Sequence, residues 1–219
     1  MNSATRSTML VAALIFLPAC AGQQTKLAPG DLRSLSSHSQ IHAVHHLPAR
    51  IFWVEGSEYT AAGTLISPLV VIVQMQESKK LQDKLRLADP APHVKVRLVA
   101  LLQRDVGLTN IRTVSGVPKD DNIELLKETF QTGAVLDVRT MKWGIDNNRA
   151  KYSARARLVR LADSTILWEA TCNEFVADKA KPSPTTEALT ANDGELLKTK
   201  LGEAADLCAD QLWAWATAR

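Results

Sequence analysis

The chain lacks the motifs by which most enzymes are found in a sequence. It has no nucleophile elbow, no His-Glu-x-x-His zinc motif, no phosphate-binding loop and no Cys-x-x-Cys pair. It also lacks a run of lysines and arginines, and its 26 basic and 23 acidic residues leave a formal net charge of only +3. Nucleic-acid-binding domains carry a concentrated basic patch. We therefore expect neither an enzyme nor a nucleic-acid-binding protein, and no cofactor.

Long apolar runs are also scarce at the N-terminus. Residues 9–17 are apolar, but a membrane-spanning helix needs about 20 such residues. The run follows a polar start that carries Arg6, and this order is typical of an export signal. It ends in Leu17-Pro18-Ala19-Cys20, which resembles a bacterial lipobox, although Pro18 occupies a position that usually holds a small or β-branched residue.

The lipobox resemblance implies that residues 1–19 are a lipoprotein signal peptide and that Cys20 is the lipidated first residue of the mature protein. Acyl chains such as palmitate contribute about 0.8 kcal/mol per buried CH₂, so stable anchoring needs more than one chain. Residue 21 is alanine and not the aspartate that retains enteric lipoproteins in the inner membrane. The expected location is the outer membrane, facing the periplasm. An uncleaved anchor and a plain secreted protein are the alternatives.

Cysteines are few, with three in the whole chain. If Cys20 carries the lipid, Cys172 and Cys208 remain, and an oxidising compartment favours a disulfide between them. Cys172 lies on the apolar face of the last predicted strand, and Cys208 lies on the apolar stripe of the last predicted helix. A disulfide is therefore expected to staple that helix to the sheet. Two free buried thiols are the alternative.

The mature chain divides into a tether and one domain. Residues 20–39 are rich in Gln, Ser, Gly and Ala, which predicts a flexible tether. Residues 40–219 are enough for a single globular domain with a substantial core. We expect this domain to be α+β, with a mixed sheet that includes an antiparallel three-strand meander and with helices packed on one face.

Hydrophobic periodicity and turn residues locate the elements of this domain. Strands are predicted at 49–55 and 109–114, and the meander at 133–143, 152–161 and 166–172. Helices are predicted at about 68–87, from 91 to a stop at Gly107, from a cap at Asp121 to Gly133, and from 195 onward. The last helix is expected to open with a capping box at 192–195, after a polar loop at 178–191.

The meander is expected to have one apolar and one polar face. Ile166 and Trp168 are predicted on the apolar side, together with Leu136, Val138 and Thr140 from the first strand. The polar side would carry Asp137 and three arginines, Arg139, Arg155 and Arg157. One interpretation is an anion- or headgroup-binding stripe; the other is an ordinary solvated face of a sheet.

Four histidines, His38, His42, His45 and His46, lie close together at the start of the domain. Imidazole is a good ligand for zinc or copper, so a metal site is one interpretation. No nearby cysteine or carboxylate completes a recognisable ligand spacing, and histidines next to a tether are usually solvated. We therefore expect no metal, with these four residues as the candidates if one binds.

The segment 61–73 is almost wholly apolar. Val70 to Val73 favour a buried strand, whereas Ser67 and Pro68 favour a helix start. We expect a helix with its apolar half in the core. If the segment instead contacts the membrane, the protein would be an oligomeric secretion or pore component.

The lipobox, together with the alternating segments 134–143 and 152–161, resembles uncharacterised proteobacterial lipoproteins. More distantly, the chain resembles the auxiliary lipoproteins of lipid-transporting ABC systems and the N-terminal domain of TolB. Those families have no catalytic residues to carry over. The resemblance implies a non-enzymatic adaptor in envelope transport or assembly, anchored to the membrane by its lipid and binding an envelope protein or a lipid. A metal-binding protein or enzyme built on the histidines is a further alternative.

Overall fold

The structure is a computed structural model that describes residues 26–28, 30–31, 34–35, 40–46, 53–55, 68–116, 122–175 and 184–217. Several predictions concern residues outside these ranges: the signal peptide, Cys20, His38 and the apolar residues 61–67. They stay predictions.

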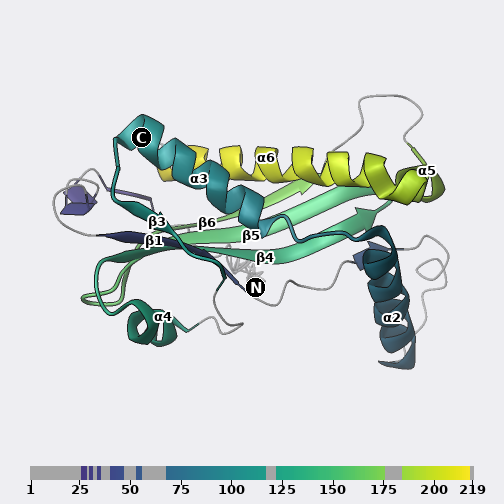
Figure 1. Ribbon diagram of the computed structural model, residues 1–219, viewed down its shortest axis with the longest axis horizontal. Coiled ribbons are helices and arrows are strands. Elements are labelled where there is room, and N and C mark those ends of the chain that lie inside the picture. The colour runs from purple at the N-terminus through teal and green to yellow at the C-terminus, as the bar shows by residue number, and fades with distance from the viewer. Residues whose placement is uncertain are drawn as a thin grey trace, which may run out of the picture.

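One mixed sheet forms the centre of the fold (Figure 1). Its strands are β1 (Ile41–His45), β2 (Trp53–Glu55), β3 (Ile111–Thr113), β4 (Ala134–Asp146), β5 (Arg149–Arg160) and β6 (Thr165–Phe175). The order is β3-β1-β4-β5-β6, and β2 pairs with the far end of β4. β1 runs parallel to both of its neighbours, whereas β4, β5 and β6 form the predicted antiparallel meander.

The helices lie mainly on one side of this sheet. They are α2 (Pro68–Leu85), α3 (Ala91–Val106), α4 (Ile123–Phe130), α5 (Thr186–Thr190) and α6 (Glu195–Thr217). α3 and α6 lie side by side over one face, and the short α4 lies against the other (Figure 1). The predicted α+β class, with its C-terminal helix on a mixed sheet, is confirmed. None of the helices in the described ranges combines the length and apolarity needed to cross a membrane.

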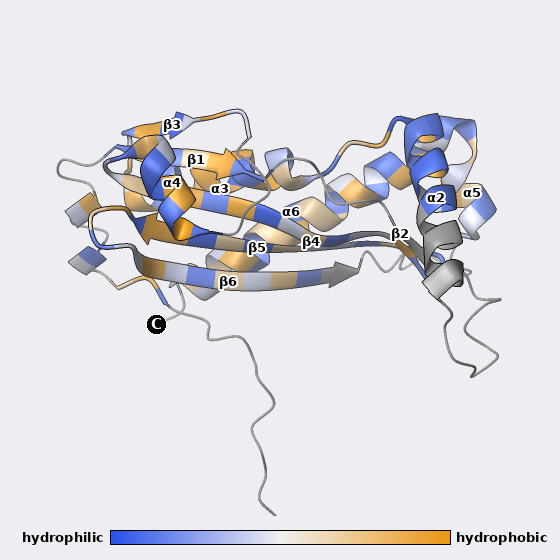
Figure 2. Cartoon of the chain, turned by 90° about the horizontal axis from the view of Figure 1, so that it is seen from below, coloured by the Kyte–Doolittle hydropathy of each residue, from blue (hydrophilic) through white to orange (hydrophobic). Residues whose placement is uncertain are grey.

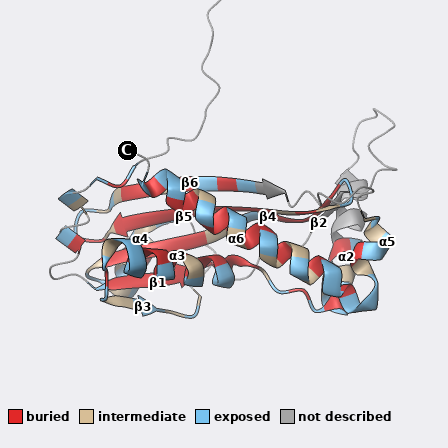
Figure 3. Cartoon of the chain, turned by 90° about the horizontal axis from the view of Figure 1, so that it is seen from above, coloured by how far each residue is buried: buried red, intermediate tan, exposed pale blue. Residues whose placement is uncertain are grey.

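The main core fills the layer between the sheet and the α3–α6 pair. Leu136 and Leu158 from the sheet, Leu98 from α3 and Leu212 from α6 are each at most 1% exposed. Figure 3 shows these buried strand surfaces beneath helices whose outer sides are exposed. Full burial of one such side chain contributes about 1.5–3 kcal/mol, so this layer holds the fold together.

A smaller cluster lies under α4 on the opposite face of the sheet. It joins Val44, Leu126, Val135 and Leu161, with Phe130 packed against it. Seen from this side, the strands mix hydrophilic and hydrophobic residues (Figure 2). The second face is therefore apolar only near α4 and becomes charged along the strands.

The ends of α3 and α4 follow from local sequence chemistry. Asp89 Oδ1 accepts a hydrogen bond from the Ala91 backbone N–H at 2.8 Å and so satisfies a free donor at the start of α3. Gly107 ends that helix with a left-handed φ of 73°. For α4 the predicted cap was wrong: Asn122, and not Asp121, accepts from the Glu124 N–H at 2.9 Å. Asp121 itself lies outside the described residues.

Three local predictions need correction. β1 was not predicted as a strand, yet it lies between β3 and β4 inside the sheet. Part of the predicted loop 178–191 forms α5. In place of the capping box, Asn192–Gly194 forms a 3-10 turn without a side-chain cap, with Asn192 and Asp193 at positive φ of 50° and 55°. Asn and Asp tolerate this conformation better than other non-glycine residues.

Two irregularities change which side chains face the core. The register of β4 shifts at Met141, between Thr140 and Lys142. Because of this bulge, Trp143 points into the α3–α6 core and is fully buried. In β6 a shift leaves Trp168 opposite Leu158 but Ile166 opposite Val159, so Ile166 does not share the face of Trp168 as predicted.

Candidate functional site

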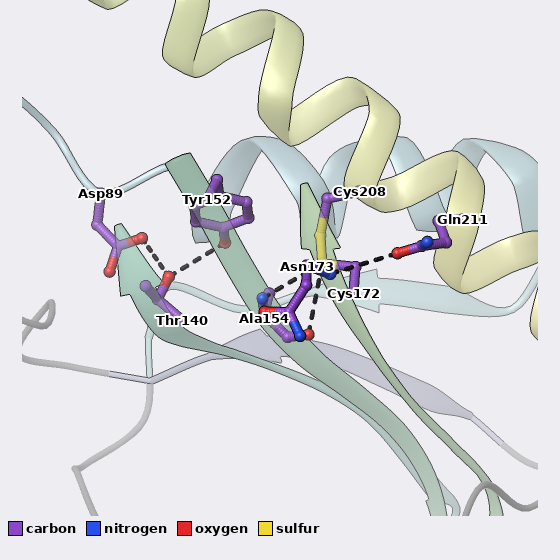
Figure 4. Close-up of a disulfide and its surroundings, with 8 residues drawn as sticks. All are labelled: Asp89, Thr140, Tyr152, Ala154, Cys172, Asn173, Cys208 and Gln211. Carbon is purple, nitrogen blue, oxygen red and sulfur yellow. Dashed lines mark hydrogen bonds between the residues drawn. A yellow bond between two sulfur atoms is a disulfide. The ribbon is translucent and has the colours of Figure 1, made fainter. Parts of the chain in front are cut away.

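The predicted disulfide joins the sheet to the last helix (Figure 4). Cys172 of β6 and Cys208 of α6 are bonded, with their Cα atoms 5.3 Å apart, and both residues are fully buried. One turn further along α6, Gln211 Oε1 accepts a hydrogen bond from the Asn173 backbone N–H at 3.3 Å. The helix is thus fastened along the outer strand β6 by a covalent bond and by a polar contact beside it.

A buried polar chain ties the start of α3 to the sheet (Figure 4). Tyr152 Oη lies 3.1 Å from Thr140 Oγ1, and Thr140 donates to Asp89 Oδ1, the atom that also caps α3. Burial raises the pKa of Tyr152 far above its usual value, and the Asp89 carboxylate adds to this effect. Tyr152 therefore keeps its proton and acts here as a hydrogen-bond donor.

On the other face of the sheet, Asp137 of β4 is a fully buried carboxylate. His46 Nε2 lies 2.6 Å from its Oδ1, Arg157 Nε donates to its Oδ2 at 2.8 Å, and Arg155 reaches Oδ2 at 3.4 Å. Burial alone would raise the pKa of Asp137. The hydrogen bond from His46 and the charges of His46, Arg157 and Arg155 outweigh burial and lower it, so the carboxylate stays ionised.

This network corrects the interpretation of the arginines. Arg155 and Arg157 lie on the predicted polar face, but Arg157 is only 4% exposed and is paired with Asp137. Arg155 also lies 4.0 Å from Glu169 on β6. For these two residues the prediction of a solvated sheet face is wrong. An external anion would also have to compete with the carboxylates that already pair with these arginines.

His42 lies on the same face as Asp137 but in a different environment. Its ring stacks on Phe130 of α4, with ring centroids 4.6 Å apart and an interplanar angle of 24°. Arg112 of β3 stands opposite it in the strand register. Burial lowers the pKa of His42, and the charge of Arg112 lowers it further, so the neutral ring is favoured.

His45 points to the opposite face, toward α3. Its Nδ1 lies 3.2 Å from Lys95 Nζ, and Lys95 also donates to the Val114 carbonyl at 2.8 Å. Lys95 is only 3% exposed, and burial lowers its pKa. Burial lowers the pKa of His45 as well, with additional effects from Lys95 and His46.

Sequence reasoning missed Lys95, although one signal was available. The residue lies three, four and seven positions before Leu98, Val99 and Leu102, all of which are buried on α3. That spacing places Lys95 on the inward face of the helix. A lysine on an apolar stripe is the kind of exception that points to a site.

The structure does not bring the described histidines together. His42 contacts Phe130, His45 contacts Lys95, and His46 contacts Asp137, with His45 on the opposite face from the other two. Within the part of the chain that the structure describes, no group of three or more His, Cys, Asp or Glu is arranged to hold a metal ion. The three described candidates, His42, His45 and His46, therefore belong to separate local networks.

The outer surface of α3 and α6 carries a second set of ion pairs. Asp206 contacts His93 at 2.9 Å and Arg97 at 3.2 Å, and Asp210 contacts Arg97 at 2.8 Å. These groups are substantially exposed, so each contributes little to stability. They help to set the relative position of the two helices.

The fold and these networks define an α+β domain with a disulfide-fastened helical layer. No protein-family model and no curated protein match the chain. Among solved structures it is similar to PelC dodecamers from Paraburkholderia phytofirmans. For a single-residue variant the identity is 12% and the TM-score 0.43, covering 90% of this chain and 98% of that one. For PelC in another crystal form the identity is 12% and the TM-score 0.42, covering 90% of this chain and 96% of that one. Similarity at this level does not assign the chain to a family.

Proposed function

We propose that the chain is an exported lipoprotein, anchored through Cys20 in the outer membrane and facing the periplasm. The observation that carries this proposal is the Cys172–Cys208 disulfide. Structural disulfides belong to oxidising compartments, so the bond supports export independently of the N-terminal signal. It also accounts for two of the three cysteines and leaves Cys20, beside the lipobox residues, for the lipid.

We further propose that the domain is a non-enzymatic binding module in envelope transport or assembly. Two of its buried ionisable groups, Asp137 and Tyr152, support this role because they are engaged in structural contacts. Asp137 is compensated by His46 and Arg157, and the Tyr152 hydroxyl bonds Thr140 beneath the start of α3. Such groups stabilise a scaffold, and recognition of a partner would then fall to surfaces of that scaffold.

Membrane fractionation with acyl labelling tests the anchor. Wild-type protein should sediment with the outer membrane and incorporate labelled palmitate, whereas Cys20→Ser should be soluble and unlabelled. Cys172→Ser is the control for labelling alone, because it removes a different cysteine and should keep the label although it loses the disulfide. A Cys20→Ser protein that stays with the membrane would overturn the anchor.

A pull-down from detergent-solubilised envelopes tests the adaptor role separately. Cross-linked wild-type protein should recover an envelope protein or a lipid that an unrelated outer-membrane lipoprotein does not recover. If Cys20 is labelled but no such partner is recovered, the lipid anchor is supported and the adaptor role is contradicted.

A further inference from the structure

We propose that Lys95 and His45 form a binding site for a small, singly charged oxyanion, of the kind found in a phosphodiester or a carboxylate. The site lies between α3 and the ends of β1 and β3, on the face of the sheet opposite Asp137. The inference does not depend on lipidation of Cys20 or on the adaptor role.

Lys95 carries a charge that no described residue compensates. Lysine is rarely fully buried unless it is paired with an acidic group, and an unpaired buried ammonium is costly. Lys95 is 3% exposed, and its two contacts, the His45 ring and the Val114 carbonyl, are neutral acceptors. Among the described residues no carboxylate contacts its Nζ. An anionic ligand would supply the missing counter-charge.

Asp137, in the same sheet, is a buried charge with the opposite surroundings. The buried carboxylate of Asp137, on the other face, is surrounded by His46, Arg157 and Arg155. The fold therefore supplies counter-charges for a buried ion where stability requires them. Lys95 is also almost without exposed surface, but it has no such partner among the described residues. Groups of this kind are concentrated at functional sites.

The hydrogen-bond donors of Lys95 are only partly used. An ammonium has three N–H donors, and Lys95 uses two of them, toward His45 Nδ1 and the Val114 carbonyl. Since Nδ1 of His45 accepts, the proton of the neutral ring is on Nε2, which is then a donor as well. One N–H donor of Lys95 thus remains for a ligand oxygen, and its single positive charge matches a singly charged oxyanion.

The place of the site in the fold also suits a ligand. His45 is the last residue of β1, and Val114 directly follows β3, so both lie at the carboxyl ends of two adjacent parallel strands. Ligands of open sheets bind preferentially outside the carboxyl ends of parallel strands. His45 is only partly buried, so the pair has a side that faces solvent.

The test measures binding to the full chain, purified in mild detergent, by calorimetric titration at constant ionic strength. The probes are acetate, inorganic phosphate and short-chain phosphatidylglycerol, with chloride as the reference. Binding of the lipid alone would identify a headgroup as the source of the oxyanion, and binding of the small anions would identify a free ligand. Either result supports the site. No binding of any probe beyond chloride overturns it.

Two variants assign that binding to the proposed residues. Lys95→Met should abolish it and, because it removes an uncompensated buried charge, should raise the thermal midpoint of the free protein. Lys80→Met is the matched control, since Lys80 is an exposed lysine paired with Glu77 on α2, and it should bind like wild type. His45→Gln is the second variant, to be used if Lys95→Met fails to fold, and it should weaken binding at least tenfold. Wild-type affinity in Lys95→Met or His45→Gln would overturn the proposal.

Discussion

His45 and His46 are neighbours in the chain but belong to opposite layers of the molecule. His45 meets the buried ammonium of Lys95 beneath α3, and His46 meets the buried carboxylate of Asp137 on the other face. The end of β1 therefore has a cationic site on one side and a compensated anionic site on the other. Substitution should therefore change stability in opposite directions at the two sites: loss of Asp137 should destabilise the protein, and loss of Lys95 should stabilise it.

Replacing Asp137 should destabilise the protein strongly. Asp137→Asn removes the negative charge but leaves Arg157 buried, and loss of one partner of a buried pair costs about 3–5 kcal/mol. Urea denaturation followed by circular dichroism measures the change in unfolding free energy. Asp163→Asn is the control, because Asp163 pairs with Arg160 at the exposed surface and its loss should have little effect. Equal effects of the two variants would contradict a stabilising role for the buried network.

Stability should fall on mild acidification because of the buried histidines. The pKa values of His42 and His45 are lowered from 6.5 in the folded protein, so below pH 6.5 the unfolded chain takes up protons that the folded chain resists. Their contribution is fully present above pH 6.5 and is lost as pH falls toward the folded values. Urea denaturation at a series of pH values measures this slope. His42→Phe should reduce it, and an unchanged slope would show that His42 is not its source.

Asp137 should produce a second loss of stability at lower pH. Its pKa is lowered from 3.8 in the folded protein, so its contribution is present above pH 3.8 and is lost as pH falls through the folded value. In Asp137→Asn this acid step should be smaller than in wild type. The comparison uses the same denaturation series, extended below pH 3.8, and an identical acid step in both proteins would be the opposite result.

The disulfide should stabilise the fold substantially. The bond closes a loop with a sequence separation of 36, for which the chain-entropy model gives about 4 kcal/mol. The double variant Cys172→Ala/Cys208→Ala should lose about this amount, and wild type in reductant should lose a similar amount. The double variant serves as its own control, since reductant should not change its stability further. A wild-type protein unaffected by reductant would mean that the bond does not contribute to stability.

Two glycines should respond to alanine in opposite directions. Gly133 has a φ of 88°, and an added Cβ would collide with the Gln40 carbonyl oxygen, so Gly133→Ala should destabilise by about 1–3 kcal/mol or more. Gly202 lies within α6 with open space at its Cβ position, so Gly202→Ala should stabilise by about 1 kcal/mol. Thermal unfolding of both variants checks the pair. Destabilisation by Gly202→Ala would contradict the described surroundings of α6.

Periodic elements were predictable from the sequence, and so was their pairing in the meander. α3 has a regular apolar stripe and a glycine stop, and the alternation in β4 and β5 locates both strands to within a few residues. The disulfide followed from the apolar faces on which Cys172 and Cys208 were expected. In each case the signal lies in residues close together in the chain.

The missed features depend on contacts between distant residues. β1 has the polar residue His42 where a strand pattern requires an apolar one, and His42 packs on Phe130, which comes from a much later segment. His46, directly after β1, pairs with Asp137 of β4. The bulge at Met141, which places Trp143 in the core, depends on how β4 pairs with β5. The spacing on α3 indicates that Lys95 faces inward, but its contact with His45, 50 positions away, could not be predicted.

The position of β1 has a mechanical consequence. The chain enters the described sheet at Ile41, and β1 is hydrogen-bonded on both sides, to β3 and to β4, as a parallel strand. A pull along the N-terminal chain would therefore load two ladders of hydrogen bonds in shear at the same time. An edge strand would oppose the same pull with only one ladder. A domain held from its N-terminal side is thus attached through an inner strand of its sheet. Such an attachment is suited to bearing tension.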